Sequence, residues 1–360
     1  MAVKRKKGVI KHIRARLVLP YNILKCKVLG RYKPLVTLLY VTDRCNLKCA
    51  YCQGHWSARK IQDFTTAELF GIVDECERLG TKHFTVHGGE ILLRDDVEAL
   101  IAHIKGKGLY VNLVTNGIIL AEHIDKIRAI DSLCISLDGS EVANDANRGA
   151  GSYKKIIEAI RLAKKEGFKF NVQATITKYS KGEVQYLAEL AKEIGYYQQF
   201  SLLLKPLEPD NNDIGLTSDE TKEVLREIIK FKKAGYPIFT SYRTLENALN
   251  WGYGYSEKPM LNKDEFAKNP GRIRCYYGKL KMVIDADGRV FPCSSLNHDF
   301  KALNVRDVGV QKAFEHVVNK NTCEACYFLT QNDWSLLLGV SPRIWLDQIK
   351  IQLKEIFNHV

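Results

Sequence analysis

The regular alternation of short apolar runs with amphipathic stretches, from residue 35 to residue 204, constrains the fold more than any other feature. Apolar, β-branched and aromatic runs, most of them followed by turn residues, predict six strands at residues 35–42, 83–87, 109–115, 132–137, 168–176 and 199–204. Helical spacing between them predicts helices at residues 66–79, 96–106, 121–130, 153–166 and 183–194. Repeated strand–helix units predict a parallel sheet covered by helices, so we expect an α/β fold, a partial (β/α)6 barrel of the TIM type.

The remaining sequence predicts further segments around this barrel. We expect a basic amphipathic arm at residues 1–34, the barrel at 35–235 and a loop-rich connection at 236–274. A small α+β cysteine-rich extension follows at 275–330, and a C-terminal helix at 331–360. The apolar residues of this C-terminal helix recur at helical spacing.

Positive charge is concentrated at the N-terminus. The formal net charge is +13, and eleven Lys or Arg residues lie between Lys4 and Lys33, whereas the first acidic residue is Asp43. The rest of the chain is close to balanced, which argues against an extended nucleic-acid surface and for a local basic arm. Pro20 is expected to end the helix that this arm begins.

The use of cysteine indicates metal sites. No run of about eighteen apolar residues predicts a membrane span, and the N-terminus lacks the apolar core of a secretory signal, so we expect a cytoplasmic protein. In that reducing compartment clustered cysteines indicate metal binding rather than disulfides. Seven of the ten cysteines fall into two groups, while Cys76 and Cys134 are expected to be core thiols.

The first group follows the first predicted strand directly. Cys45, Cys49 and Cys52 have the spacing C-x3-C-x2-C, and three thiolates on one loop can bind three irons of a cubane cluster. The fourth iron would then keep an open position, which a catalytic metal needs. The alternative is zinc, but a closed zinc site needs four ligands, and only His55 is near enough in sequence to be the fourth.

This loop resembles that of the radical S-adenosylmethionine (SAM) superfamily, with Tyr51 as the aromatic residue before the last cysteine. The resemblance implies a [4Fe–4S] cluster whose open iron binds S-adenosylmethionine. It also implies one-electron cleavage to a 5′-deoxyadenosyl radical, which abstracts hydrogen from a substrate. Such chemistry belongs to the cofactors, and the protein positions them and excludes water.

Further motifs follow in the order of that family. Gly88, Gly89 and Glu90 resemble its GGE segment, which receives the methionine amino group, although Ile91 replaces the usual proline. By the same resemblance, Ser136 and Arg148 match positions that hold the methionine carboxylate, and an arginine fork suits a carboxylate. Without that context, Ser136 would be a strand hydroxyl and Arg148 a surface charge. No catalytic acid, base or hydrogen-atom donor is assigned.

The second cysteine group lies in the C-terminal part of the chain. Residues 285–288 predict a hairpin turn that brings Cys275 near Cys293, and Cys323 and Cys326 form a C-x2-C pair. Four thiolates suit either zinc or a fully ligated [4Fe–4S] cluster. The spacing resembles the twitch, or shortened SPASM, extension of radical SAM enzymes, which implies one auxiliary [4Fe–4S] cluster.

Substrate and partners are less constrained. The basic arm could lie on an anionic membrane surface, and residues 21–36 resemble the corresponding segment of adenosylhopane-forming enzymes. We therefore expect a lipid or other apolar substrate, with peptide or protein modification as the alternative. An electron donor such as flavodoxin or ferredoxin is implied, and no nucleic acid is expected.

A second class of function explains fewer features. A non-enzymatic zinc protein that binds nucleic acid through its arm would account for the cysteine pairs and the charge. It would not account for strand–helix repeats with GGE after the second strand.

Overall fold

The computed structural model describes residues 19–52, 61–203, 214–296 and 300–340. Six parallel strands form most of its sheet, in the order in which they follow one another in the sequence. They are β1 (Val36–Tyr40), β2 (His83–His87), β3 (Tyr110–Thr115), β4 (Ser132–Ser136), β5 (Phe170–Ile176) and β6 (Tyr197–Leu202). The predicted partial α/β barrel is confirmed.

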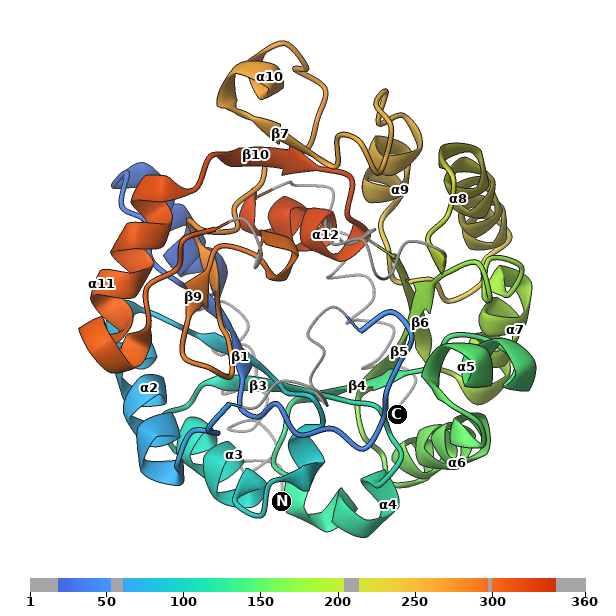
Figure 1. Ribbon diagram of the computed structural model, residues 1–360, viewed down its shortest axis with the longest axis horizontal. Helices are drawn as coiled ribbons and strands as arrows, with labels where there is room; N and C mark the ends of the chain where they lie inside the picture. Colours follow the sequence, from blue (N-terminus) through green and yellow to red (C-terminus); the bar gives the residue numbers. More distant parts are fainter. Residues whose placement is uncertain (1–18, 53–60, 204–213, 297–299, 341–360) are drawn as a thin grey trace, which may run out of the picture.

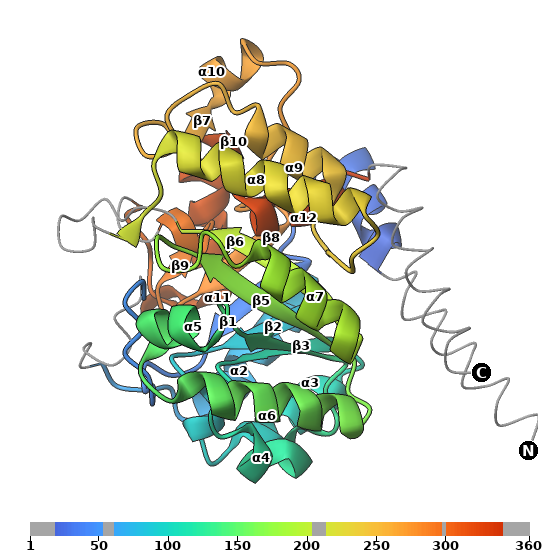
Figure 2. The same cartoon turned by 90° about the vertical axis from the view of Figure 1, so that its right-hand side faces the viewer.

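Helices surround this curved sheet (Figure 1). The helices that follow the strands are α2 (Thr66–Leu79), α3 (Val97–Gly106), α4 (Leu120–His123), α6 (Ser152–Lys165), α7 (Val184–Ile194) and α8 (Ser218–Lys233). A short helix, α5 (Glu141–Arg148), precedes α6, and α5, α6 and α7 lie along one side of the sheet in Figure 2. Local signals set their ends, since Thr65 and Thr217 form capping boxes at α2 and α8.

The C-terminal part of the chain joins the same sheet. The expected hairpin is confirmed as β8 (Lys281–Ile284) and β9 (Val290–Phe291), which pair antiparallel. β8 also pairs with β1 in parallel, so the sheet extends to eight strands. Its two edges, β6 and β9, are not paired with each other.

A helix fills the opening between these edges. α12 (Leu329–Leu338) lies inside the ring of strands in Figure 1 and packs on β6. Gln199 of β6 donates a hydrogen bond to Thr330 over 3.4 Å, and the Nζ atom of Lys281 of β8 lies 4.2 Å from the Trp334 ring centroid. α12 therefore bridges the two sides of the open barrel.

Other C-terminal elements pack outside the sheet. α11 (Val305–Lys320) packs beside α2. The expected loop-rich connection contains α9 (Tyr242–Leu249), β7 (Met260–Asn262) and α10 (Lys263–Ala267). β7 pairs antiparallel with β10 (Cys323–Cys326), so the C-x2-C pair lies on a short strand rather than on a turn.

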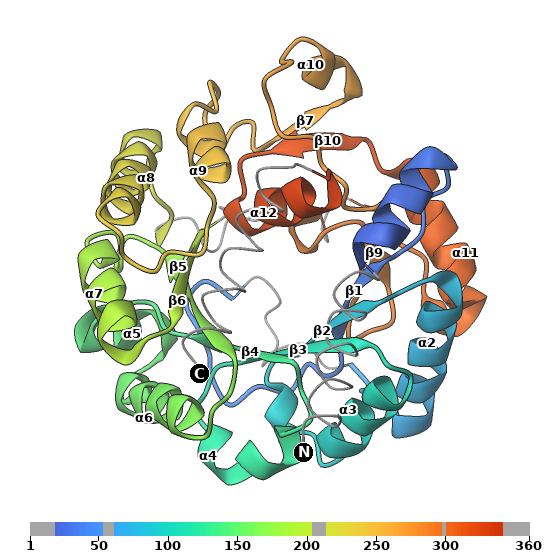
Figure 3. The same ribbon diagram turned by 180° about the vertical axis from the view of Figure 1, so that it is seen from behind.

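The N-terminal segment is described only from residue 19. The helix expected before Pro20 lies outside the described residues, whereas residues 19–28, which include Pro20, are helical. Ile23 and Cys26 bury one side of this helix, drawn in blue in Figure 3, in a small core with Leu338. Of the C-terminal helix predicted at 331–360, residues 331–338 belong to α12, and residues 341–360 lie outside the described residues. No described helix is long and apolar enough to cross a membrane.

The inner face of the barrel is almost uncharged and carries both polar and apolar side chains. The register places Leu38, Tyr110 and Val114 on this face. Pairing in register and the alternation of faces direct a row of amides and hydroxyls inward. These side chains are Asn112, Ser132, Ser136, Asn171, Gln173, Thr175, Gln199 and Ser201. Some are paired, as Asn171 donates to Gln199 over 3.1 Å. Lys281 is the one Lys, Arg, Asp or Glu at the described inward strand positions.

Candidate active site

The three clustered thiols lie on the loop after β1, at the carboxyl edge of the sheet. Cys45, Cys49 and Cys52 are half-buried and free, and the Cys52 amide donates to the Cys49 carbonyl over 3.1 Å. Burial, with smaller contributions from the charges of Cys52, Asp138 and Cys45, raises the pKa of Cys49 to about 11, although Arg148 opposes the rise. The Cys49 thiol would therefore be protonated at neutral pH without a metal.

The glycines of the second loop pack against this first loop. The Gly89 amide donates to the Thr42 carbonyl, and the Glu90 amide to the Arg44 carbonyl, each over 2.8 Å. A Cβ atom at Gly89 would lie 2.4 Å from the Arg44 carbonyl oxygen, and one at Gly88 would lie 2.8 Å from Thr42 Cγ2. Only glycine permits this approach, which holds the residue directly before Cys45.

Glu90 links this region to the loop after β3. Its buried carboxylate accepts hydrogen bonds from the Thr115 hydroxyl over 2.8 Å and from the Asn116 amide over 2.7 Å. Burial raises the pKa of Glu90. The Asn116 side chain in turn donates to Cys45 Sγ over 3.9 Å and to Asn46 over 2.7 Å. Asn116 therefore supports Cys45, although the sequence indicates only a turn at this position.

A buried carboxylate supports the other end of the cysteine loop. Asp138, in the turn after β4, accepts a hydrogen bond from Tyr51 Oη over 2.8 Å and one from Arg148 Nη2 over 3.0 Å. The Arg148 guanidinium lies 5.5 Å from the Tyr51 ring centroid, and the Ala50 amide donates to the Asn147 carbonyl. The loop is thus attached to α5. Asp138 was not predicted as a site residue, because Asp–Gly after a strand indicates only a turn.

Ser136 and Arg148 lie at this same edge. Ser136 is the last residue of β4, half-buried and opposite Gln173 of β5. Arg148 is the last residue of α5 and is buried, with its guanidinium directed at Asp138. The structure therefore brings both residues to the side of the cysteine loop, and the methionine carboxylate as their ligand stays a prediction.

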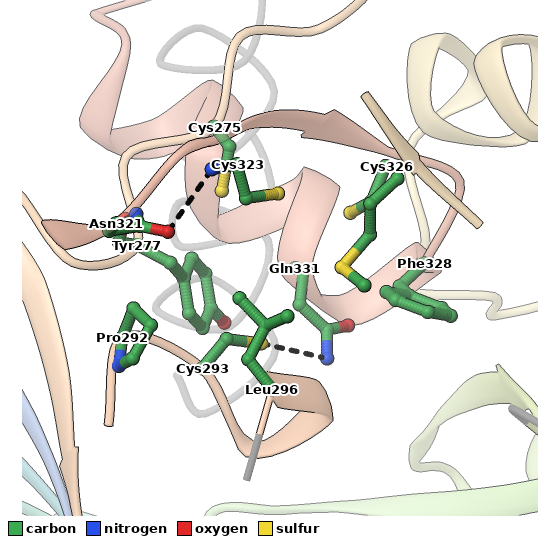
Figure 4. A pocket seen from close by; sticks show the side chains of 11 residues that line it. Cys275, Tyr277, Pro292, Cys293, Leu296, Asn321, Cys323, Cys326, Phe328 and Gln331 are labelled. Atoms are coloured by element: carbon green, nitrogen blue, oxygen red, sulfur yellow. Dashed lines mark hydrogen bonds between the residues drawn. The ribbon is translucent and has the colours of Figure 1, made fainter. Parts of the chain in front are cut away.

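The second cysteine group lines one pocket. Cys275, Cys293, Cys323 and Cys326 come from three separate segments and surround the Tyr277 ring (Figure 4). All four are free, and Cys275, Cys293 and Cys326 are buried. A hydrogen bond from the Cys323 thiol lowers the pKa of Cys275, so these two sulfurs are in contact.

Backbone and amide hydrogen bonds fix the segments that carry these thiols. The Cys275 amide donates to the Glu324 carbonyl over 2.7 Å. The Asn332 and Asn247 side chains both donate to the Cys326 carbonyl, over 2.9 and 3.2 Å. Gln331 of α12 donates to Cys293 Sγ over 3.9 Å. The pocket thus depends on α9, α12 and β10 together.

The donors fit iron–sulfur clusters by their chemistry. Three thiols on one loop leave one iron of a cubane without a protein ligand, whereas four thiols around one pocket can ligate all four irons. Across the described ranges, no three His, Cys, Asp or Glu side chains converge on a single metal ion.

The motifs and their placement agree with a known family. The sequence profile of the Radical SAM superfamily matches residues 39–191, which include the cysteine loop and the strands from β2 to β5. The chain contains a radical SAM domain. It is therefore an enzyme of this class, and its relatives are named as synthases, maturases and cyclases.

Several curated proteins of this family resemble the chain. An AdoMet-dependent heme synthase of Methanosarcina barkeri is 33% identical over 172 residues, 46% of this chain and 49% of that protein. The chain thus matches about half the length of this relative. The heme synthase of Nitratidesulfovibrio vulgaris is 26% identical, over 72% of this chain and 73% of that protein. The mycofactocin maturase MftC of Mycolicibacterium smegmatis is 26% identical, over 80% and 71%.

Solved structures share the fold over most of the chain. Streptococcus suis SuiB bound to its precursor peptide SuiA has a TM-score of 0.65 at 16% identity, covering 82% of this chain and 69% of that one. Native anSMEcpe with bound AdoMet and a Kp18Cys peptide has a TM-score of 0.61 at 20% identity, covering 86% and 98%. At these identities the likeness establishes the fold alone.

Proposed function

We propose that the chain cleaves S-adenosylmethionine at a [4Fe–4S] cluster on Cys45, Cys49 and Cys52 and modifies a peptide. The observation that carries the first part is the placement of three free thiols at the carboxyl edge of the barrel, on a loop held by Gly88 and Gly89. When bound, the cluster and S-adenosylmethionine supply the radical that abstracts hydrogen. The chain's own residues position that pair next to the lumen.

Individual residues have distinct parts in this proposal. Ser136 and Arg148 would hold the methionine carboxylate, and the GGE backbone would face the methionine amino group. Tyr51 and Asp138 would keep the cysteine loop in place through their 2.8 Å hydrogen bond. The carboxylate of Glu90 is used by Thr115 and Asn116, so its part is to hold the loops together.

The second group would hold an auxiliary cluster. Cys275, Cys293, Cys323 and Cys326 fill all four ligand positions, which leaves no iron for a substrate. Electron transfer or structural support is the role that such a closed site allows. An electron donor such as flavodoxin or ferredoxin would reduce the enzyme.

The lumen favours a peptide over the other substrates considered. Inward-facing amides and hydroxyls match the hydrogen-bonding groups of a peptide backbone. A haem precursor carries several carboxylates, whereas the described strand positions offer one cation, Lys281. The expected lipid has no support among the relatives reported above, which are named for haem synthesis and mycofactocin maturation. MftC, a maturase aligned over 80% of the chain, supports the peptide.

Formation of 5′-deoxyadenosine tests the cluster assignment. The anaerobically reconstituted protein should contain about eight irons and should form 5′-deoxyadenosine with dithionite and S-adenosylmethionine. Replacing Cys45, Cys49 and Cys52 with Ala should abolish the product and leave about four irons. Cys26→Ala is the matched control, since this buried thiol lies outside both groups. Unchanged cleavage in the triple variant would refute the assignment.

A separate experiment tests the substrate class. Synthetic peptides encoded beside the gene are incubated with the enzyme, dithionite and S-adenosylmethionine. Mass spectrometry should find one peptide altered, and a deuterated version should transfer deuterium to 5′-deoxyadenosine. If these peptides stay unmodified while anionic lipid vesicles or haem precursors react, the peptide assignment is wrong and the cluster assignment stands.

A further inference from the structure

Lys281 is a buried cation on the inner face of the barrel. It is only 2% exposed and is the first residue of β8, directly beside Val36 of β1. Its Nζ atom lies 4.7 Å from the Tyr277 ring centroid and 4.2 Å from the Trp334 ring centroid. The ammonium is therefore held between two aromatic rings, one of which also lines the auxiliary cysteine pocket.

No carboxylate balances this charge among the described residues. The Lys281 ammonium takes part in none of their ion pairs or hydrogen bonds, in contrast to that of Lys279, which pairs with Glu324. A buried ammonium without an anion is costly, and cation–π contacts offset only part of that cost. The surroundings of Lys281 on β2 are neutral as well, because burial lowers the pKa of His83 to about 3 and of His87 to about 4.

The cysteine pocket is the source of negative charge that acts on Lys281. Burial lowers the pKa of Lys281 to about 7, whereas the charges of Cys293 and Cys275 raise it. These sulfurs thus act on the ammonium across the Tyr277 ring. Four thiolates around a [4Fe–4S] core carry a net negative charge, which increases when the cluster accepts an electron.

We propose that Lys281 is the buried counter-cation of the auxiliary cluster and sets its reduction potential. This inference rests on the auxiliary cluster of the proposed function. A positive charge in a low-dielectric site stabilises the more negative, reduced cluster and so raises its potential. Lys281 faces the lumen, so its charge lies on the side of the cluster nearest to the space for the substrate. The raised potential favours transfer of an electron to the auxiliary cluster.

An EPR-monitored redox titration measures this effect. Full-length protein with Cys45, Cys49 and Cys52 replaced by Ala is used, so that only the auxiliary cluster gives a signal. Lys281→Met removes the charge and keeps the length of the side chain, and it should shift the midpoint potential to more negative values. Lys281→Arg keeps the charge and should stay near the parent potential.

A matched control separates charge from burial. Lys258→Met removes another lysine that lies over a ring, 5.2 Å from the Tyr253 centroid, but this lysine is partly exposed and paired with Glu265. It should leave the potential unchanged. If Lys281→Met retains its iron but has the parent potential, the inference is wrong and the cluster assignment stands. If the parent gives no cluster signal, both are wrong.

Discussion

Asp138 shows how much one buried carboxylate supports at this site. It is fully buried, and its two oxygens accept hydrogen bonds from Tyr51, Arg148 and the Thr175 amide. Asp138→Ala would leave the Arg148 guanidinium buried without its anion. We expect the free energy of unfolding to fall by about 3–5 kcal/mol, the usual effect of removing one partner of a buried ion pair.

Anaerobic urea denaturation measures this loss. Asp125→Ala is the control, because Asp125 pairs with Arg128 at the surface, where its side chain is 85% exposed. That change should cost less than about 1 kcal/mol. Equal losses in the two variants would contradict a special role for Asp138.

Residue-level predictions came from the sequence where a motif carried the information, and the ligands of these residues stay predictions. The cysteine spacings and GGE pointed to positions that the structure places at two sites. Asp138 and Asn116 were missed because their hydrogen bonds, to Tyr51 and Cys45, span 87 and 71 positions of the sequence. Lys281 was missed because its inward position depends on strand pairing with Val36, 245 positions away. A local pattern does not encode such contacts.

At the scale of elements, the close approach of two loops decides whether the cysteine loop can form. Gly89→Ala places a Cβ atom 2.4 Å from the Arg44 carbonyl oxygen, and this backbone atom cannot move aside cheaply. We expect the loop to shift and the iron content to fall from about eight to about four per chain. Formation of 5′-deoxyadenosine should fall at least tenfold.

The control for this variant is Gly71→Ala. Gly71 lies inside α2 with no atom within 4 Å of an added Cβ, so alanine should fit and slightly favour the helix. Iron analysis and product formation should match the parent. Full iron content and activity in Gly89→Ala would show that the close packing is dispensable.

Elements defined by local signals were predicted closely. The strand at 83–87 and the helix at 66–79 match β2 and α2, since alternation, caps and turn residues lie within each segment. The position of α12 inside the barrel and the pairing of β8 with β1 were not predicted. Both depend on the space and the strand edge that the other strands of the barrel leave free, which are properties of the tertiary structure.

At the scale of the whole molecule, α12 and α9 close the gap between β6 and β8. Asp333 of α12 connects them, since its Oδ1 accepts hydrogen bonds from the Ser241 amide over 3.1 Å, the Ser241 hydroxyl over 2.7 Å and the Thr244 hydroxyl over 2.7 Å. Its Oδ2 is buried without a hydrogen-bond partner among the described residues. The Asp333 carboxylate therefore joins α12, which carries Gln331, to α9, which carries Asn247.

This connection predicts how stability depends on pH. Burial raises the pKa of Asp333 to about 6, against about 3.9 in an unfolded chain. The folded state therefore holds the proton more tightly, so the stability that protonation gives is complete below about pH 4 and is lost as the pH rises to about 6. Asp333→Asn cannot ionise and lacks this loss. The melting temperature of the parent minus that of Asp333→Asn should decrease between about pH 4 and pH 6 and then level off, as anaerobic thermal scans can measure. A difference that is constant across this range would mean that Asp333 does not couple closure of the barrel to protonation.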